Sequence, residues 1–445
     1  MLTAGIDIGT SKICGMVIDD NAKPLKIIKY PNNAGLPGKT EKEQNPEIIL
    51  EICKKLYREM KSAFPDISAL GITGQMHGIL YVDEVGNAVS SLYTWQDRKG
   101  MEIRDNDTSY ADYLSNVTGH RCISGHGLVT HSYFLHKHVV PERAKKICTV
   151  SAYVAMHFAG RKSPILHKSD AESFDVFDLK NDRFDLNALA KAGISADVLP
   201  DIRSDESIIG KTEEGVSVLI PIGDNQASII GSLCPENTPL INLGTGGQIS
   251  MILPKSEISD YPGLSVRPFV DNKFLIVGIT QCGGYAYALL ERFFEKTAKM
   301  LGITPPDDLF ERMEKEAAKT VTTNPIVAET TFLGTYDQPT KKASFSNITE
   351  NNFTPGNITF ATLNGMCFEL FNIYSERILP YIKKKPEKII GAGNCIRQTK
   401  LLENIIENTF KLPLTVNEQK EEAVYGASLL ALSVERKENK TNEPR

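Results

Sequence analysis

The chain has 445 residues, of which 41% are hydrophobic and 24% are charged, as in ordinary folded proteins. This composition excludes a disordered chain, a collagen-like or coiled-coil rod and a mini-protein. The 50 basic and 55 acidic residues give a net charge of -5, so no basic field would attract nucleic acid, and we expect none as a partner.

Two similar hairpins are predicted at positions far apart in the chain. Residues 2–20, LTAGIDIGTSKICGMVIDD, alternate apolar and small residues on both sides of a Gly-Thr turn. Residues 239–254, PLINLGTGGQISMILP, repeat this design around a Gly-Thr-Gly-Gly turn. Because a domain-sized length follows each hairpin, we expect two related lobes.

The elements between and after the hairpins alternate helix and strand, which predicts α/β layers. The domains are expected at 1–235 and 236–432, and the polar residues 433–445 are expected to form a disordered tail. The patterns predict helices over 46–62, 284–300, 359–379 and 400–410, strands over 69–72 and 388–390, and a charged loop over 178–185.

Location and metal content are inferred from what the sequence lacks. No apolar run approaches the roughly 18 residues of a membrane span and no secretory signal precedes the first strand, so we expect a cytoplasmic protein. The eight cysteines show no zinc-type spacing, which favours reduced core residues. The densest histidine group, His131, His136 and His138, has no acidic or thiol neighbours, and we assign it no metal.

Both hairpin turns suit phosphate binding, since successive backbone N–H groups point outward and glycine removes side-chain bulk. Thr10, Ser11 and Lys12 add hydroxyl and ammonium donors to the first turn, and Asp7 is suited to direct a magnesium ion. The second hairpin carries Asn242 at the equivalent place, which leaves one metal-directing acid. Either turn alone is also ordinary hairpin chemistry, but the pair at domain spacing favours a phosphate site.

The sequence GAGN, residues 391–394, lies between a predicted strand and a predicted helix. Glycines let a flat base or sugar approach the backbone there, and the helix N-terminus offers positive potential. Alone, the segment is better explained as a tight turn between strand and helix. No Rossmann unit with an acidic residue surrounds it, which disfavours a dinucleotide enzyme. We interpret it as an adenosine contact.

Asp224 is the candidate catalytic base. It follows the apolar run 216–220 and a glycine, which predicts a carboxylate at a strand end facing a cleft. Transfer of a phosphoryl group to an alcohol needs a proton acceptor near the hydroxyl. The same aspartate would also serve as the cap of the following helix, and the sequence leaves both roles open.

Two further segments carry groups that suit a polyol. The motif GQMHG places the Gln75 amide and the His77 imidazole between glycines after a strand. The motif TWQDR holds the single tryptophan, Trp95, with Asp97, a grouping suited to stacking on a sugar and bonding its hydroxyls. A polar turn and a core tryptophan are the simpler alternatives for each segment alone.

Taken in order, IDIGTSK, GQMHG, TWQDRK, GDNQAS, LGTGG, GAGN and EEAVYGASLLAL resemble the FGGY family of carbohydrate kinases, over residues 3–432. The resemblance implies an α/β, two-lobed, actin-like ATPase fold of the ribonuclease H-like type, with duplicated domains and a central cleft. It also implies ATP and Mg²⁺ as cofactors. GQMHG is shared with xylulokinases, whereas TWQD, GDNQAS and residues 332–348 are similar to the sedoheptulokinases.

The resemblance assigns roles residue by residue. It implies that Asp224 is the catalytic base and Asp7 the magnesium-directing acid. Lys12 stands where many family members have a small residue, and the lysine of those members falls at the position of Cys14. The role of Lys12 at ATP therefore stays open. The remaining implied contacts are Met76, His77 and Asn225 at the sugar, and Thr10, Ser11, Gly244, Thr245 and Gly246 at the ATP phosphates. The adenosine contact interpreted above would come from Gly391, Gly393 and Asn394.

The expected activity is ATP-dependent phosphorylation of the terminal hydroxyl of a ketose, with sedoheptulose giving its 7-phosphate. Xylulose or another pentulose is the alternative substrate, because one added group in a pocket changes binding by only about 1–3 kcal/mol. From another class, GIDIGTSKI and the paired hairpins suggest an actin-like assembly ATPase. We expect a monomer or homodimer whose partners are a small-molecule ketose and ATP.

Overall fold

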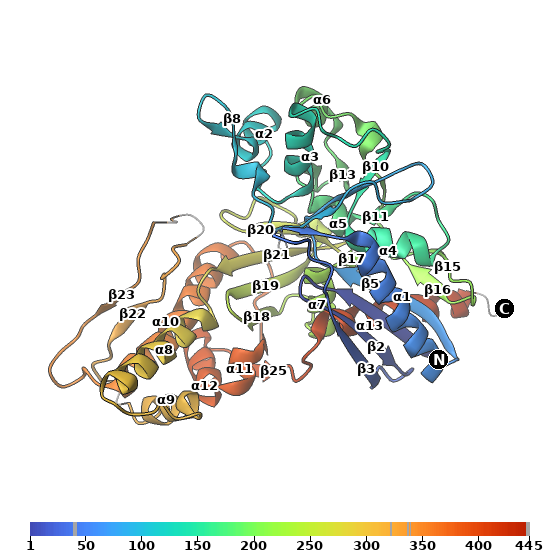
Figure 1. Ribbon diagram of the computed structural model, residues 1–445. Coiled ribbons are helices and arrows are strands. Elements are labelled where there is room, and N and C mark those ends of the chain that lie inside the picture. The colour runs from blue at the N-terminus through green and yellow to red at the C-terminus, as the bar shows by residue number, and fades with distance from the viewer. Residues whose placement is uncertain (39–41, 321–322, 336–337, 339, 442–445) are drawn as a thin grey trace. The chain divides into compact units, whose positions relative to one another are not determined.

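The computed structural model describes residues 1–38, 42–320, 323–335, 338 and 340–441 (Figure 1). The chain divides into two units, each with its own sheet and its own core. Unit 1 comprises Met1–Gly231, Arg267–Lys273 and Glu421–Arg445, and unit 2 comprises Ser232–Val266 and Phe274–Lys420. The segment from Glu421, expected in the second domain, therefore packs with the first.

The sheet of unit 1 has the strand order β15-β16-β5-β1-β2-β3, and β17 also pairs with β5. The expected first hairpin is β1 and β2, joined by a turn in which Gly9 N donates to Lys12 O over 3.0 Å. Strands β1, β5 and β17 run parallel, so their carboxyl ends meet at one edge. The bounds are β1 Leu2–Ile8, β2 Lys12–Ile18, β3 Pro24–Pro31, β5 Ile67–Gly74, β15 Ile208–Lys211, β16 Ser217–Leu219 and β17 Ile222–Gly223.

Three helices pack on this sheet. Helix α1 (Pro46–Ala63) begins where the predicted helix does, because the Asn45 side chain accepts from two N–H groups and Pro46 is preset for the first turn. Helix α7 (Asp224–Gly231) follows β17 directly, and α13 (Glu422–Thr441) lies against α7 and β1.

The remaining elements of unit 1 lie mainly between β5 and β15, and they form a second part of the same hydrophobic core. They are β4 Glu43–Gln44, β6 Leu80–Val82, β7 Leu92–Tyr93, β8 Ile103–Asp105, β9 Thr108–Ser109, α2 Tyr110–Thr118, α3 Gly127–His136, β10 Lys146–Cys148, α4 Val150–Phe158, β11 Ile165–His167, α5 Lys168–Glu172, β12 Phe177–Asp178, β13 Arg183–Phe184, α6 Leu186–Lys191 and β14 Asp201–Arg203.

The sheet of unit 2 has the order β20-β21-β19-β18-β24-β25. The expected second hairpin is β18 and β19, and β24 pairs parallel to β18 with Asn242 opposite Ala392. The bounds are β18 Pro239–Leu243, β19 Gly247–Pro254, β20 Ser265–Phe269, β21 Lys273–Thr280, α8 Gly284–Met300, α9 Leu309–Ala317, β22 Val327–Glu329, β23 Ser344–Ser346, α10 Pro355–Ile373, α11 Asn394–Gln398, β24 Ile389–Ala392, α12 Lys400–Phe410 and β25 Leu414–Val416.

Three expectations from the sequence were wrong in detail. The charged stretch 178–185 contains paired strands, because Phe184 is buried opposite Phe177 and anchors β13. The helix expected over 359–379 ends as α10 at Ile373 and continues as a π-helical turn. The tail expected from 433 is helical to Thr441, since α13 continues and still buries Val434, while residues 442–445 lie outside the described part.

Helices α7 and α13 cross at two glycines. A Cβ placed on Gly426 would lie 1.8 Å from the Ala227 carbonyl oxygen, and one on Gly231 would lie 1.9 Å from that of Glu422. Such distances are far below van der Waals contact, so the two backbones approach closely only because both side chains are absent.

The variant Gly426→Ala is expected to destabilise unit 1 by about 3 kcal/mol, because overpacking must push the helices apart. A fall in the melting temperature by scanning calorimetry would show this. Ser433→Ala, at an exposed position of the same helix, is the matched control and should melt near the unmodified protein. If Gly426→Ala melted at the same temperature as Ser433→Ala, the close approach of α7 and α13 at Gly426 would be contradicted.

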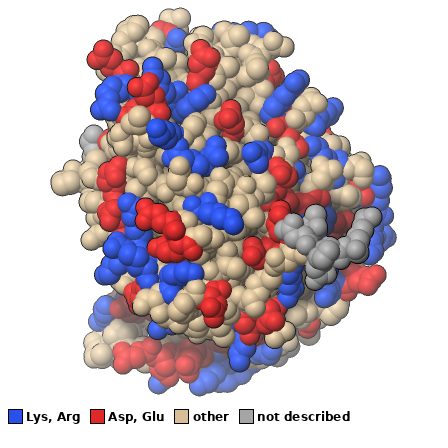
Figure 2. Space-filling view, turned by 90° about the vertical axis from the view of Figure 1, so that its right-hand side faces the viewer, with Lys and Arg blue, Asp and Glu red and all other residues tan. Residues whose placement is uncertain are grey.

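The cysteines, the histidine group around His131 and the surface are the remaining features of the fold. All eight cysteines are free thiols, and seven of them are buried. His131 and His136 bond the hydroxyls of Tyr81 and Tyr110. Within the described residues, no helix has both the length and the apolar character to cross a bilayer. Figure 2 shows basic and acidic side chains interspersed on the face it displays.

Candidate active site

Two carboxylates meet at the carboxyl edge of the unit 1 sheet. Asp7 lies on β1 opposite Thr73 of β5, and Asp224 follows β17, whose Gly223 pairs with Gly74 of β5. Burial raises the pKa of Asp7 to about 7, and the neighbouring charge of Asp224 is the next largest cause. The shared strand β5 thus brings together two residues that are far apart in the sequence.

Asp224 occupies the first position of helix α7. Burial raises its pKa to about 6, while the backbone N–H of Asn225 and the guanidinium of Arg267 oppose that rise. A carboxylate with a pKa near 6 is mostly ionised at neutral pH and still accepts a proton readily. Asp224 therefore has the properties of a general base as well as a place at a helix start.

A third carboxylate, Asp170 of α5, was missed by the sequence analysis. Its Oδ2 accepts from Thr149 over 3.1 Å and from Ser151 over 2.9 Å, while its Oδ1 has no hydrogen-bond partner. Burial raises its pKa to about 7, and the charge of Asp224 adds to the rise. No local motif marks this residue, because the packing of α5 beneath β17 brings it to the site.

The first hairpin turn is held by a network of side chains. Thr10 Oγ1 donates to Gln75 Oε1 over 3.3 Å and accepts from Trp95 Nε1 over 3.2 Å. Gln44 Nε2 donates to the Thr10 carbonyl over 2.9 Å, while Ser11 is exposed at the tip. The network connects the expected phosphate turn to both segments expected at the sugar.

Lys12 has a partner that the sequence did not indicate. Its Nζ lies 2.7 Å from Oε2 of Glu421, and Lys29 Nζ lies 2.6 Å from Oε1 of the same carboxylate. Glu421 precedes α13, so Lys12 joins the first hairpin to the C-terminal helix. The side chain of Lys12 is therefore engaged in an ion pair at the edge of the turn.

The expected sugar-binding residues fall into two groups. Trp95 is 48% exposed, so the core alternative for the single tryptophan is wrong. Gln75 is buried in the Thr10 network, and Met76 is buried against Gly223. Asp97 is buried and paired with Lys99, whose Nζ lies 2.6 Å away.

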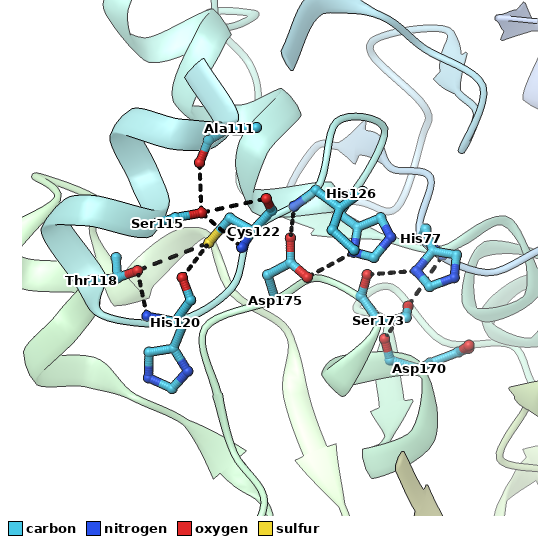
Figure 3. Close-up of polar contacts among 11 residues, drawn as sticks. His77, Ala111, Ser115, Thr118, His120, Cys122, His126, Asp170, Ser173 and Asp175 are labelled. Carbon is cyan, nitrogen blue, oxygen red and sulfur yellow. Dashed lines mark hydrogen bonds and ion pairs between the residues drawn. The ribbon is translucent and has the colours of Figure 1, made fainter. Parts of the chain in front are cut away.

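His77 and Asn225 both have polar partners within unit 1. His77 Nδ1 lies 3.1 Å from the Ser173 carbonyl oxygen, and its ring stacks on that of His126 (Figure 3). Arg267 Nη1 donates to Asn225 Oδ1 over 3.3 Å. Arg267 also acts electrostatically on Asp224, His77 and Glu172, so it belongs to this site although the sequence gave no sign of it.

Unit 2 contains a cavity of about 990 Å³ beside the second hairpin turn. Of the residues expected at ATP, Gly244, Thr245, Gly393 and Asn394 line it. Gly246 and Gly391 are not among its lining residues, since Gly391 is buried within β24. Much of the lining could not be predicted from local sequence patterns, and it includes Gly284, Tyr285, Tyr287, Arg292, Glu311, Glu314 and Arg397.

The hairpin turn and the start of helix α8 form one wall of this cavity. Gly284 N donates to the Gly244 carbonyl over 2.7 Å, and Tyr285 N donates to that of Thr245 over 3.0 Å. A Cβ on Gly283 would lie 2.3 Å from the Gly246 carbonyl oxygen, so this contact requires glycine. The pair Gly283-Gly284, which precedes a predicted helix, is the sequence feature from which this cavity wall could have been predicted.

The acidic groups in the described residues suit a magnesium ion only in part. No group of three or more His, Cys, Asp and Glu side chains in that part of the chain could hold a metal alone. Mg²⁺, however, commonly binds through one or two carboxylates together with water and substrate phosphates. The oxygen donors of Asp7 and Asp224, close enough for one charge to raise the pKa of the other, fit that mode.

Known sugar and glycerol kinases are similar to this chain in sequence and in fold. Mouse (Mus musculus) sedoheptulokinase is 24% identical, with 97% of each chain covered. A xylulose kinase of Staphylococcus xylosus is 22% identical, with 99% of this chain and 92% of the relative covered. The crystal structure of Plasmodium falciparum glycerol kinase with ADP superposes with a TM-score of 0.79 at 18% identity, covering 98% of this chain and 90% of that one.

The solved relatives confirm the expected α/β, actin-like ATPase fold. The model of the N-terminal domain of the FGGY family of carbohydrate kinases matches residues 2–232, which hold Asp7, Asp224 and the expected sugar-binding segments. This match covers more than half of the sequence. The chain therefore belongs to the FGGY family of carbohydrate kinases.

Proposed function

We propose that this protein is an ATP-dependent kinase that phosphorylates the terminal hydroxyl of a ketose, with sedoheptulose as the substrate. The observation that carries the proposal is the placement of Asp224 at the start of α7, with a pKa raised to about 6, beside Asp7. The likeness to sedoheptulokinase over 97% of both chains supports the choice of sugar.

Asp224 acts on the acceptor hydroxyl in the proposed reaction. Its carboxylate accepts the hydroxyl proton as the hydroxyl oxygen bonds to the γ-phosphorus of ATP. The bond between that phosphorus and the β,γ-bridging oxygen breaks, and ADP leaves with its electron pair. Arg267, which lowers the pKa of Asp224, keeps more of this carboxylate in the ionised form that the reaction needs.

Asp7 is the residue that would hold Mg²⁺, with Asp224 as the neighbouring carboxylate. The ion supplies neutralisation of the charge on the β- and γ-phosphates when it is bound. Asp7 is on β1 and held in register by β2 and β5, so its position does not depend on a mobile loop. A bound cation would lower the pKa of Asp7 from about 7, because a cation stabilises the ionised carboxylate.

The nucleotide is assigned to the cavity of unit 2. Thr245 and Gly244 offer a hydroxyl and an open backbone for phosphate, and Asn394 begins α11 next to this turn, since β24 pairs with β18. The glycerol kinase with a similar fold is described with ADP, which supports an adenine nucleotide here. Within unit 1, the hydroxyls of Thr10 and Ser11 remain predicted phosphate contacts.

A coupled assay of ADP release with a panel of ketoses tests the function. Sedoheptulose should give the largest kcat/KM, and xylulose is the second candidate because GQMHG is shared with xylulokinases and the Staphylococcus xylosus relative is a xylulose kinase. Glycerol and gluconate serve as controls for other alcohols. If no ketose raises the rate of ADP release above the rate with ATP alone, the proposal of a ketose kinase is refuted.

A further inference from the structure

Two imidazole rings are stacked next to the candidate active site. The ring centroids of His77 and His126 lie 3.9 Å apart with 15° between their planes (Figure 3). His77 lies in the loop after β5, and His126 directly precedes α3. The side chain of His126 makes no capping bond to α3, so helix capping does not account for its orientation.

One turn of the chain holds both rings by their edges. His77 Nδ1 lies 3.1 Å from the Ser173 carbonyl oxygen, and His126 Nδ1 lies 2.7 Å from Asp175 Oδ1. The backbone is fastened to the same turn, because His77 N donates to Ser173 Oγ over 3.2 Å and Ile123 N to Asp175 Oδ2 over 3.0 Å. Figure 3 shows the two rings directed to this turn after α5.

These contacts determine which nitrogen of His77 carries the proton. A carbonyl oxygen only accepts hydrogen bonds, so Nδ1 of His77 is the donor. Burial, with the charges of His126 and Arg267, holds the pKa of His77 well below its ordinary value, and the ring is therefore neutral. A neutral ring protonated at Nδ1 presents Nε2 as a hydrogen-bond acceptor.

We propose that His126, held by Asp175, is a positioning residue that keeps His77 oriented with Nε2 as the acceptor for a hydroxyl of the alcohol substrate. The inference rests on the proposed function, in which His77 contacts the sugar. His126 covers one face of the His77 ring, and Asp175 prevents the His126 ring from turning away. The side chains of His126 and Asp175 are 15% and 8% exposed, so bulk water competes little for their bond.

Three variants test this role through steady-state kinetics on the ketose that the unmodified protein uses best. His126→Ala should raise KM for the ketose about tenfold, with kcat and KM for ATP changed less than about twofold. His126→Asn keeps an N–H group near the place of Nδ1 and should return KM to within about threefold of the original. His120→Ala, which removes a second histidine–aspartate pair with Asp185, is the matched control and should leave KM unchanged.

The tautomer of His77 gives a second measurement that needs no turnover. Nitrogen-15 spectra of the histidine side chains should show a single Nδ1-protonated form for His77 in the unmodified protein and a mixture in His126→Ala. An unchanged tautomer, a ketose KM within twofold of the original, or an equal rise in KM for ATP would overturn the inference. If the unmodified protein phosphorylates no ketose, the proposed function fails, and the spectra decide the positioning separately.

Discussion

Replacing Asp224 with asparagine is expected to lower kcat by about 10²–10⁴-fold, the contribution of a positioned general base. The amide has nearly the same shape and cannot accept the hydroxyl proton. Nucleotide binding should survive, because the residues that line the cavity beside Thr245 all belong to unit 2. The measurements are kcat with saturating ketose and ATP, and the dissociation constant for ADP by calorimetry.

The control for this variant is Asp66→Asn, which makes the same chemical change at an exposed position between α1 and β5. It should keep full activity. In the unmodified protein kcat/KM should fall as pH drops below about 6, because protonation of Asp224 removes the base. An Asp224→Asn protein that retains a rate within fivefold of the original would contradict the assigned role.

Replacing Asp7 with asparagine is expected to lower turnover strongly and to stabilise the metal-free protein at pH 8. Activity should fall by about 10²-fold or more, because the residue proposed to hold Mg²⁺ loses its charge. Stability should rise because the folded protein no longer keeps a buried carboxylate ionised beside Asp224. A gain of about 2–4 °C in melting temperature is expected for each kcal/mol of this penalty that the substitution removes.

The pH dependence of this gain follows from the sign of the pKa shift. The pKa of Asp7 is about 7 in the folded protein and near 3.8 in the unfolded chain, so the folded state binds the proton more tightly. The unmodified protein therefore loses stability as pH rises from about 4 to 7, whereas Asp7→Asn does not titrate. Melting curves in EDTA should differ most at pH 8 and converge near pH 4. A variant that melts lower at pH 8 would contradict the burial cost.

Local patterns were sufficient to predict the elements that hold the candidate site residues. The apolar strands around Gly9 and the Gly-Thr-Gly-Gly turn indicated both hairpins, because turn residues and side-chain alternation are local properties. Asp224 was identified because a glycine and an apolar run precede it, and the structure places it directly after β17.

Contacts between distant parts of the chain could not be predicted in this way. Asp170 faces Asp224 only because α5 packs beneath β17, and Lys12 meets Glu421 across 409 positions of sequence. Asp97 was expected to bind sugar, but its local pairing with Lys99 became visible only with the burial of both side chains. The stacking of His126 on His77 likewise depends on the packing of α3 against the loop after β5.

The most direct test is the fate of the γ-phosphate when the unmodified protein is given γ-labelled ATP, Mg²⁺ and sedoheptulose. A ketose kinase must move the label into a sugar monophosphate, in amounts equal to the ADP formed. We predict this product, with little label in inorganic phosphate. Label found only in inorganic phosphate, with light scattering that rises with ATP whether or not sugar is present, would contradict it and favour an assembly ATPase.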